Sequence, residues 1–309
     1  MRLTVTGADG FIGRAVVRKL ITEGVPPYDL LLVDRAFAKE TTAHRLVGDL
    51  TDERILTAAM ARCDALLHLA ALPGGAAQAD PRLSRRINVD VPMRLIERME
   101  GRRLILAGSI AVLGGEPAGP VTDISPPRPD SVYGTHKAMV ELAFGDAVRR
   151  GAAAGALLRL PGVVARPASA GGFGSAWMSD IFHAARTGRP TRLPVGRGAT
   201  SWLASVEVTA RNLVHALCAG FTVAEPVTLP ALRARIGDLT DYLSQRFGYD
   251  GFTHEEDPVV RRMFGTYPPL STPLAERLGF ARDNDLPALV DAVLDGMSDE
   301  DGTTLRSNE

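Results

Sequence analysis

The stretch Arg2-Leu-Thr-Val-Thr-Gly-Ala-Asp-Gly-Phe-Ile-Gly13 begins as a short apolar strand and passes directly into three closely spaced glycines. An amphipathic run follows to Glu23, so the order of elements is strand, glycine turn and helix. Gly7 permits a tight turn, Gly10 lets the backbone approach a pyrophosphate, and Gly13 lets the helix pack closely on the strand. The free amides at the helix N-terminus then face the phosphates. The pattern predicts a dinucleotide-binding unit.

A second apolar strand, residues 30–33, ends in Asp34, about 20 residues beyond the glycine turn. A carboxylate at this position accepts a hydrogen bond from a ribose 2′-hydroxyl and repels a 2′-phosphate. We therefore expect NAD rather than NADP as the cofactor. The neighbouring Arg35 is the side chain that favours the opposite preference.

Strands and helices alternate to about residue 165, as a doubly wound parallel sheet requires. We therefore predict an α/β fold in which residues 1–165 form an NAD-binding Rossmann core. Beyond this point the pattern loosens. Residues 166–297 are expected to form a smaller C-terminal substrate-binding lobe that is interwoven with the core, and the polar residues 298–309 a disordered tail.

Tyr133 and Lys137 stand four residues apart in Ser-Val-Tyr-Gly-Thr-His-Lys, so on a helix they share one face. A tyrosine with an ordinary pKa of about 10 is a poor base at neutral pH. A fixed ammonium, with the positive ring of a cofactor nearby, can lower this pKa, which makes the pair a candidate acid/base. The intervening His136 is expected to turn away from this face toward the surface.

Ser109 ends the apolar strand that includes residues 104–107. A hydroxyl at the carboxyl end of a parallel strand points into the crevice where ligands of such sheets bind. Ser109 is therefore expected to hold a substrate oxygen while Tyr133 moves its proton.

Together these residues resemble the extended short-chain dehydrogenase/reductase family, also called the NAD-dependent epimerase/dehydratase family. The resemblance covers nearly the whole chain in order. Its carriers are residues 6–13, Asp49-Leu50, His68-Leu-Ala-Ala71, Asn88, Ser109 with residues 111–114, the Tyr133/Lys137 pair and residues 158–164. One position departs from the pattern: the family often has a second hydroxyl residue before the catalytic serine, and this chain has Gly108.

The resemblance implies roles for individual residues. Asp49 and Leu50 would flank the adenine, Ala70 and Ala71 would line the cofactor cleft, and the backbone of residues 161–163 would meet the nicotinamide amide. The complete set of expected NAD-binding residues is Gly7, Gly10, Phe11, Ile12, Gly13, Asp34, Asp49, Leu50, Leu69, Ala70, Ala71, Asn88, Tyr133, Lys137, Pro161 and Val163.

Residues 162–201 bear on the identity of the substrate. They contain no asparagine, and they have Arg166-Pro167 where nucleotide-sugar enzymes of the family commonly have Gly-Pro. They are rich in arginine, whose planar guanidinium is suited to binding a carboxylate with two hydrogen bonds. Arg166 follows the strand end beside the expected nicotinamide site. We therefore predict that Ser109, Tyr133 and Arg166 bind the substrate.

Segments of the second half, such as 164–167, 201–205 and 210–216, are similar to the D-erythronate dehydrogenase group of this family. This resemblance implies oxidation of the 2-hydroxyl of a small sugar acid with NAD, catalysed by Ser109, Tyr133 and Lys137. Threonate, another aldonate or a uronate would fit as well. Two alternatives stay open, namely a nucleotide-sugar epimerase or dehydratase and a non-catalytic NAD-sensing protein on the same fold.

The composition narrows the classes of protein to which the chain could belong. The chain has 309 residues, 45% hydrophobic and 23% charged, and a net charge of −1, which gives no sign of a nucleic-acid or membrane partner. Its apolar runs are shorter than a membrane span, and we expect a cytoplasmic protein whose candidate assembly is a homodimer. Cys63 and Cys218 are expected to be buried and inert. The six histidines lack ligand spacing, so no metal site is expected.

Overall fold

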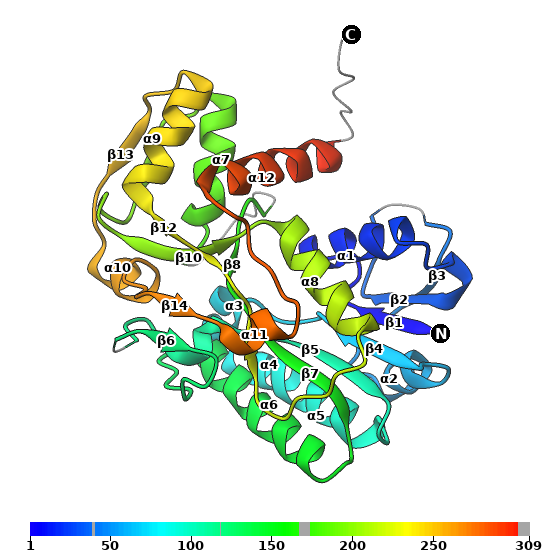
Figure 1. The fold of residues 1–309 in the computed structure, drawn as a ribbon. Coiled ribbons are helices and arrows are strands. Elements are labelled where there is room, and N and C mark those ends of the chain that lie inside the picture. Colours follow the sequence, from blue (N-terminus) through cyan, green and yellow to red (C-terminus); the bar gives the residue numbers. More distant parts are fainter. Residues whose placement is uncertain (39–40, 118, 167–173, 302–309) are drawn as a thin grey trace.

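The computed structural model describes residues 1–38, 41–117, 119–166 and 174–301 (Figure 1). A seven-stranded parallel sheet with the order β11-β7-β5-β4-β1-β2-β3 forms its centre. The strands are β1 (Leu3–Thr6), β2 (Leu30–Asp34), β3 (His44–Val47), β4 (Ala65–His68), β5 (Arg103–Ser109), β7 (Ala154–Leu160) and β11 (Val227–Thr228). The strand order reverses between β1 and β4, and ligands of such sheets bind at the carboxyl ends of the strands near this point. The predicted α/β Rossmann fold is confirmed.

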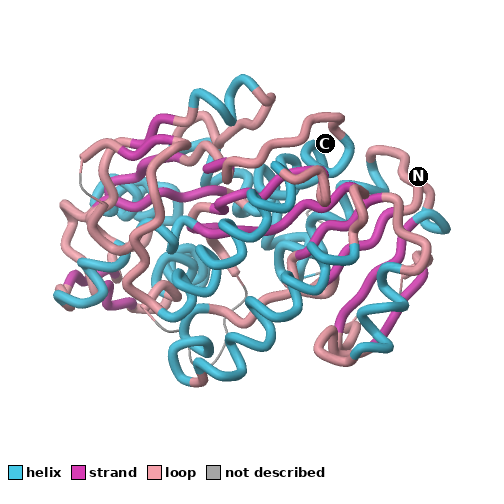
Figure 2. The backbone as a smooth tube through the Cα atoms, turned by 90° about the horizontal axis from the view of Figure 1, so that it is seen from below, coloured by secondary structure: helices cyan, strands magenta, loops and turns pink. Residues whose placement is uncertain are grey.

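Helices cover both faces of this sheet, as the tube in Figure 2 shows. One face carries α1 (Phe11–Thr22) and α8 (Val206–Cys218), and the other carries α2 (Glu53–Met60), α5 (Val91–Arg98) and α6 (Val132–Arg149). Successive side chains of a strand point to opposite faces, so β5 directs Ile105 to the first helix layer and Leu104 and Leu106 to the second. Burial on both faces explains why these strands are apolar throughout.

A smaller unit packs beside the carboxyl ends of the sheet. Its three-stranded sheet, in the order β12-β10-β8, is joined by α7 (Trp177–Thr187), α9 (Ile236–Phe247) and α12 (Leu286–Asp301) around a separate hydrophobic cluster. The strands of this unit and its margin are β6 (Val121–Thr122), β8 (Gly162–Val163), β9 (Thr191–Leu193), β10 (Thr200–Ala204), β12 (Leu232–Arg235), β13 (Phe252–His254) and β14 (Leu270–Ser271). The short helices are η1 (Pro27–Asp29), α3 (Gly74–Ala79), α4 (Pro81–Arg85), η2 (Arg86–Asp90), η3 (Ile110–Leu113), α10 (Pro258–Phe264) and α11 (Pro273–Arg277).

The chain passes between the two units more than once. It leaves the large sheet after β7, forms β8 to β10, returns as α8 and β11, and then crosses again to form β12 and α9 (Figure 1). No single cut in the chain therefore separates the large sheet from the smaller unit.

Two expectations differ from the structure. Helix α12 continues to Asp301, beyond the expected start of the tail at residue 298, and residues 302–309 lie outside the described part of the chain. Cys63 is buried as expected, but Cys218 is exposed because it ends α8 at the rim of the sheet. Within the described residues, no helix combines the length and apolar character needed to cross a membrane.

Candidate active site

The glycine turn after β1 is tightly enclosed. Gly7 has a left-handed φ of +68°, and a Cβ atom there would lie 2.6 Å from the backbone nitrogen of Ala70. A Cβ on Gly13 would lie 2.1 Å from the carbonyl oxygen of Gly7, so α1 can approach β1 only with glycine here. The turn leads into the N-terminus of α1, where the first amides lack intrahelical partners. This cradle fits a dinucleotide phosphate.

The acidic residues at neighbouring strand ends differ in their surroundings. The Asp34 carboxylate, at the end of β2, accepts hydrogen bonds from the backbone nitrogens of Asp9 at 2.9 Å and Arg35 at 2.7 Å. It therefore lies against the glycine turn, where a ribose of a dinucleotide would sit. Asp49 follows β3, is exposed and accepts a hydrogen bond from the Thr51 nitrogen at 2.8 Å, whereas Leu50 is buried.

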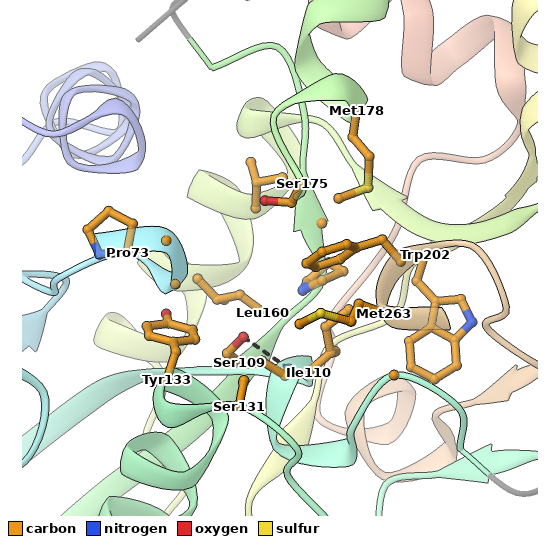
Figure 3. Close-up of a pocket in the computed structure, with 18 of the residues that line it drawn as sticks. Pro73, Ser109, Ile110, Ser131, Tyr133, Leu160, Ser175, Met178, Trp202 and Met263 are labelled. Carbon is orange, nitrogen blue, oxygen red and sulfur yellow. Dashed lines mark hydrogen bonds between the residues drawn. The ribbon is translucent and has the colours of Figure 1, made fainter. Parts of the chain in front are cut away.

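The three expected catalytic residues come from two adjacent elements. Ser109 is the last residue of β5, and its Oγ accepts a hydrogen bond from the nitrogen of Ala111 at 3.1 Å. Tyr133 and Lys137 occupy the first turns of α6, a helix that begins where the Ser131 hydroxyl caps the Gly134 amide. Figure 3 shows the Ser109 and Tyr133 hydroxyls directed into the same cavity.

The Tyr133 phenol is not activated by the chain alone. Burial raises the pKa of Tyr133 to about 12, against smaller lowering effects of the Ser109 hydroxyl and the Arg166 charge. The Lys137 ammonium lies 5.6 Å from the phenol ring centroid and donates instead to the Ala107 carbonyl at 2.8 Å. The expectation that Lys137 and the positive ring of a cofactor together lower this pKa stays a prediction, since burial acts in the opposite direction in the chain alone.

Ser109 and Tyr133 lie at one end of a cavity of about 250 Å³. The expected cofactor residues Ile12, Pro161 and Val163 also border it, so residues far apart in the sequence meet here. Asp34, Asp49 and Leu50 do not border this cavity; they lie at the ends of β2 and β3, along the same edge of the sheet. The opposite wall comes from the smaller unit (Figure 3) and consists of Arg166, Ser175, Met178, Trp202, Met263, Phe264 and Tyr267.

Arg166 is held by its backbone at the mouth of this cavity. Its nitrogen donates to the Ser179 hydroxyl at 3.2 Å, and its carbonyl lies 2.8 Å from His183 Nε2 on α7. Its guanidinium donates to the Ser175 hydroxyl at 3.3 Å. The preceding Ala165 has a φ of 59°, a left-handed conformation that is rare for a residue with a Cβ atom. This bend turns the chain from β8 toward α7.

Asn88 supports the loop after β4 rather than facing the cavity. Its side chain accepts from the Leu72 nitrogen at 2.8 Å and donates to the Leu72 carbonyl at 2.9 Å. It also donates to Ser84 Oγ, which lies 2.8 Å from His136 Nδ1. His136 therefore faces away from Tyr133, as expected, but is half-buried and bonded rather than solvated. The four-residue spacing of Ser84 and Asn88 was an available signal for this network.

Gly108, which stands where the family often has a second hydroxyl residue, lies close to β7. A Cβ atom at this position would lie 2.6 Å from Leu157 Cδ2 and 3.0 Å from the Leu158 carbonyl oxygen. A side chain at this position would therefore require the Leu157 side chain to move. Among the described residues, no cluster of histidine, cysteine or acidic side chains could hold a metal ion.

Comparison with known proteins identifies the family. A model of the NAD dependent epimerase/dehydratase family matches residues 3–214. The chain is 30% identical to the D-erythronate dehydrogenase of Cupriavidus necator, over 96% of this chain and 98% of that protein. It is 26% identical to the D-erythronate dehydrogenase of Haemophilus influenzae, over 96% and 99% of the two chains. Among solved structures, the nucleoside-diphosphate-sugar epimerase from Agrobacterium tumefaciens superimposes with a TM-score of 0.85 at 26% identity, covering 99% of this chain and 96% of that one. The chain belongs to the NAD-dependent epimerase/dehydratase family.

Proposed function

We propose that the protein is an NAD-dependent dehydrogenase that oxidises the 2-hydroxyl of a small sugar acid, with D-erythronate the first compound to test. The observation that carries this proposal is that Ser109, Tyr133 and Arg166 border the same cavity. Full-length similarity to two D-erythronate dehydrogenases supports the same substrate class.

In the proposed reaction, Tyr133 as phenolate accepts the proton of the substrate hydroxyl. Ser109 donates a hydrogen bond to the same oxygen and positions it. Lys137 stabilises the phenolate and binds the nicotinamide ribose. When bound, NAD would supply the acceptor for the hydride that leaves carbon 2 and, in its oxidised form, a positive charge beside the phenol. Such a charge favours the phenolate and so opposes the effect of burial on Tyr133.

For the cofactor we propose the glycine turn as the pyrophosphate site and Asp34 as the ribose partner. The remaining contacts, proposed by family resemblance, are Phe11, Ile12, Asp49, Leu50, Leu69, Ala70, Ala71, Pro161 and Val163. Asn88 is proposed to act indirectly, because it bonds the backbone of Leu72 in the loop that follows Ala71.

Arg166 is proposed to bind the substrate carboxylate. It borders the cavity together with Ser175, and its charge acts on the Tyr133 phenol, so the two side chains lie within electrostatic reach of each other. A bidentate contact of a guanidinium with the carboxylate would place the adjacent carbon, which bears the 2-hydroxyl, toward Ser109 and Tyr133.

A substrate screen tests this proposal. The purified protein is incubated with NAD and, in separate reactions, with D-erythronate, threonate, longer aldonates, uronates and nucleotide sugars, and NADH absorbance and product are both measured. We expect net NADH with at least one sugar acid. Conversion of a nucleotide sugar without NADH accumulation would instead support an epimerase, the second candidate, which the structural likeness to a nucleoside-diphosphate-sugar epimerase favours. Binding of NAD with no turnover of any compound would support an NAD sensor.

The assembly and location of the protein stay predictions. Helix α6 exposes Leu142, with 67% of its surface accessible, and the nearby Met139. Apolar side chains at the surface of a helix are compatible with the candidate homodimer. Light scattering of the purified protein measures the assembly, and fractionation of cells tests the expected cytoplasmic location.

A further inference from the structure

We propose that Glu141, held in place by its buried ion pair with Arg159, keeps Lys137 charged, while Arg159 limits this effect, so that both are positioning residues for the Tyr133–Lys137 pair. The inference rests on the proposed role of Lys137 in the reaction. It does not depend on the identity of the substrate.

The ion pair is fully enclosed and doubly hydrogen-bonded. Arg159 Nε donates to Glu141 Oε1 at 3.0 Å and Arg159 Nη2 to Glu141 Oε2 at 2.9 Å. The side chains expose only 1% and 3% of their surfaces. The remaining guanidinium nitrogen, Nη1, donates to the Ser125 carbonyl at 2.9 Å. The pair is therefore rigid, with both carboxylate oxygens occupied.

The ion pair links α6 to the strand that pairs with the end of β5. Glu141 lies one helical turn after Lys137, on the same face of α6. Arg159 pairs with Gly108 in the sheet, and the next residue, Leu160, pairs with Ser109. The ion pair thus joins the helix that carries Tyr133 and Lys137 to the strand beside Ser109.

Lys137 depends on this pair for a counter-charge. The lysine is buried, and its Nζ has the neutral Ala107 carbonyl as hydrogen-bond acceptor. Burial lowers the pKa of Lys137 to about 8, and the charge of Glu141 opposes this effect. From β4, the buried His68 faces the lysine, and burial lowers its pKa to about 3, so the imidazole is neutral. Glu141 is therefore the carboxylate that favours the ammonium form.

Arg159 gives the cluster of Lys137, Glu141 and Arg159 a net positive charge. Glu141 alone would neutralise Lys137, whereas lysine, glutamate and arginine together carry one net positive charge beside Tyr133. Fold stability alone does not account for such a cluster, because replacing a buried ion pair by apolar residues of similar volume is often neutral or stabilising. A role in the electrostatics of the phenol does account for it.

The lysine content of the chain allows a direct test. The sequence holds three lysines, Lys19, Lys39 and Lys137, so protein labelled with carbon-13 at lysine Cε gives three titrating signals, and K137M assigns one of them. In E141Q we expect the pKa of Lys137 to fall by about one unit or more, since an opposite charge has been removed. In R159M we expect the pKa of Lys137 to rise, because Glu141 then acts on the lysine without a competing cation.

Three controls separate this role from general damage to the fold. Asp146 on the same helix pairs at 2.8 Å with Arg150, the residue that follows the helix, and both side chains are exposed, so D146N should leave the Lys137 signal unchanged. The Lys19 signal reports on a pair with Glu23 at the surface and should be constant in all variants. E141D keeps the negative charge, so its Lys137 pKa should stay close to that of the wild type.

A Lys137 pKa unchanged in both E141Q and R159M would overturn the proposal, and so would shifts of equal size in D146N. If E141Q fails to fold, the rise expected in R159M still decides the matter. The NMR titration requires no substrate, so its outcome is independent of the sugar-acid screen. A positive titration with no sugar-acid turnover would reject the proposed function and leave this inference standing.

Discussion

The two walls of the proposed active site, one along the edge of the large sheet and one in the smaller unit, differ in what they are built from. The cofactor wall is mainly backbone, since it consists of the glycine turn after β1 and the ends of parallel strands. The substrate wall consists of side chains such as Met178, Trp202 and Met263, which come from separate parts of the smaller unit. A backbone wall follows from the fold and suits any protein that binds the same dinucleotide. A side-chain wall can change without changing the fold, so we expect it to set the substrate.

The largest effect is expected where the two walls meet. Tyr133→Phe should reduce turnover by at least about a hundredfold, because the hydroxyl is the proposed proton acceptor. The affinity for NAD should change by less than about twofold, since this hydroxyl does not hold the dinucleotide. Steady-state kinetics and isothermal titration measure the two effects. Lys137→Met should reduce both. Retention of more than a few per cent of turnover in the phenylalanine variant would show that another base acts.

A side chain added to the cofactor wall should damage binding and stability together. Gly7→Ala combines a left-handed φ with a Cβ only 2.6 Å from the Ala70 backbone, and we expect a loss of about 3 kcal/mol in unfolding free energy and weaker NAD binding. Gly24→Ala is the matched control, because Gly24 is also left-handed but its Cβ would meet no atom within 4 Å. It should cost about 1 kcal/mol and leave NAD affinity intact. Equal NAD binding in both variants would refute the proposed pyrophosphate site.

Removal of a charge from the substrate wall should weaken substrate binding and leave cofactor binding intact. Arg166→Ala is expected to raise KM for the sugar acid about ten- to a hundredfold, the loss of one charge-assisted contact, with NAD affinity unchanged. Arg192→Ala serves as control, because Arg192 pairs with Glu255 at the surface at 2.6 Å and does not border the cavity. If both variants behave alike, the carboxylate is bound elsewhere.

The smallest effect concerns stability beneath the cofactor wall. Burial lowers the pKa of His68 to about 3, so the folded protein keeps this side chain neutral while the unfolded chain takes up a proton below its ordinary pKa of 6.5. Stability should therefore fall as the pH decreases below 6.5, by at most about 1.4 kcal/mol between pH 6.5 and pH 5.5 from this group. Urea unfolding of the wild type and of His68→Gln between neutral and mildly acidic pH measures the difference. Parallel pH curves for the two proteins would contradict the assignment.

The difference between the two walls also explains which parts of the site could be predicted from the sequence. The glycine turn and the Tyr133/Lys137 pair depend on spacing within one or two turns of chain, so a local pattern is sufficient to find them. The neighbours of Trp202 and Tyr267 in the cavity are set by packing across the fold, for which no local pattern exists.

The burial of individual side chains was also not predicted correctly from the sequence. The expected lowering of the Tyr133 pKa considered charges alone, whereas burial is a property of the whole fold and acts in the opposite direction. Cys218 was expected to be buried from its apolar neighbours in sequence, but the end of α8 brings it to the surface.

The repeated crossing of the chain between its two units bears on how the protein is made. Helix α8 covers one face of the large sheet, and β11 forms its last edge strand, although both come after β10 of the smaller unit. Synthesis must therefore reach Thr228, of 309 residues, before the sheet is complete. Until then the nascent chain exposes the free edge of β7 and the apolar residues that α8 will cover, the kind of surface that chaperones bind. We expect folding to begin late in translation and to involve both units together.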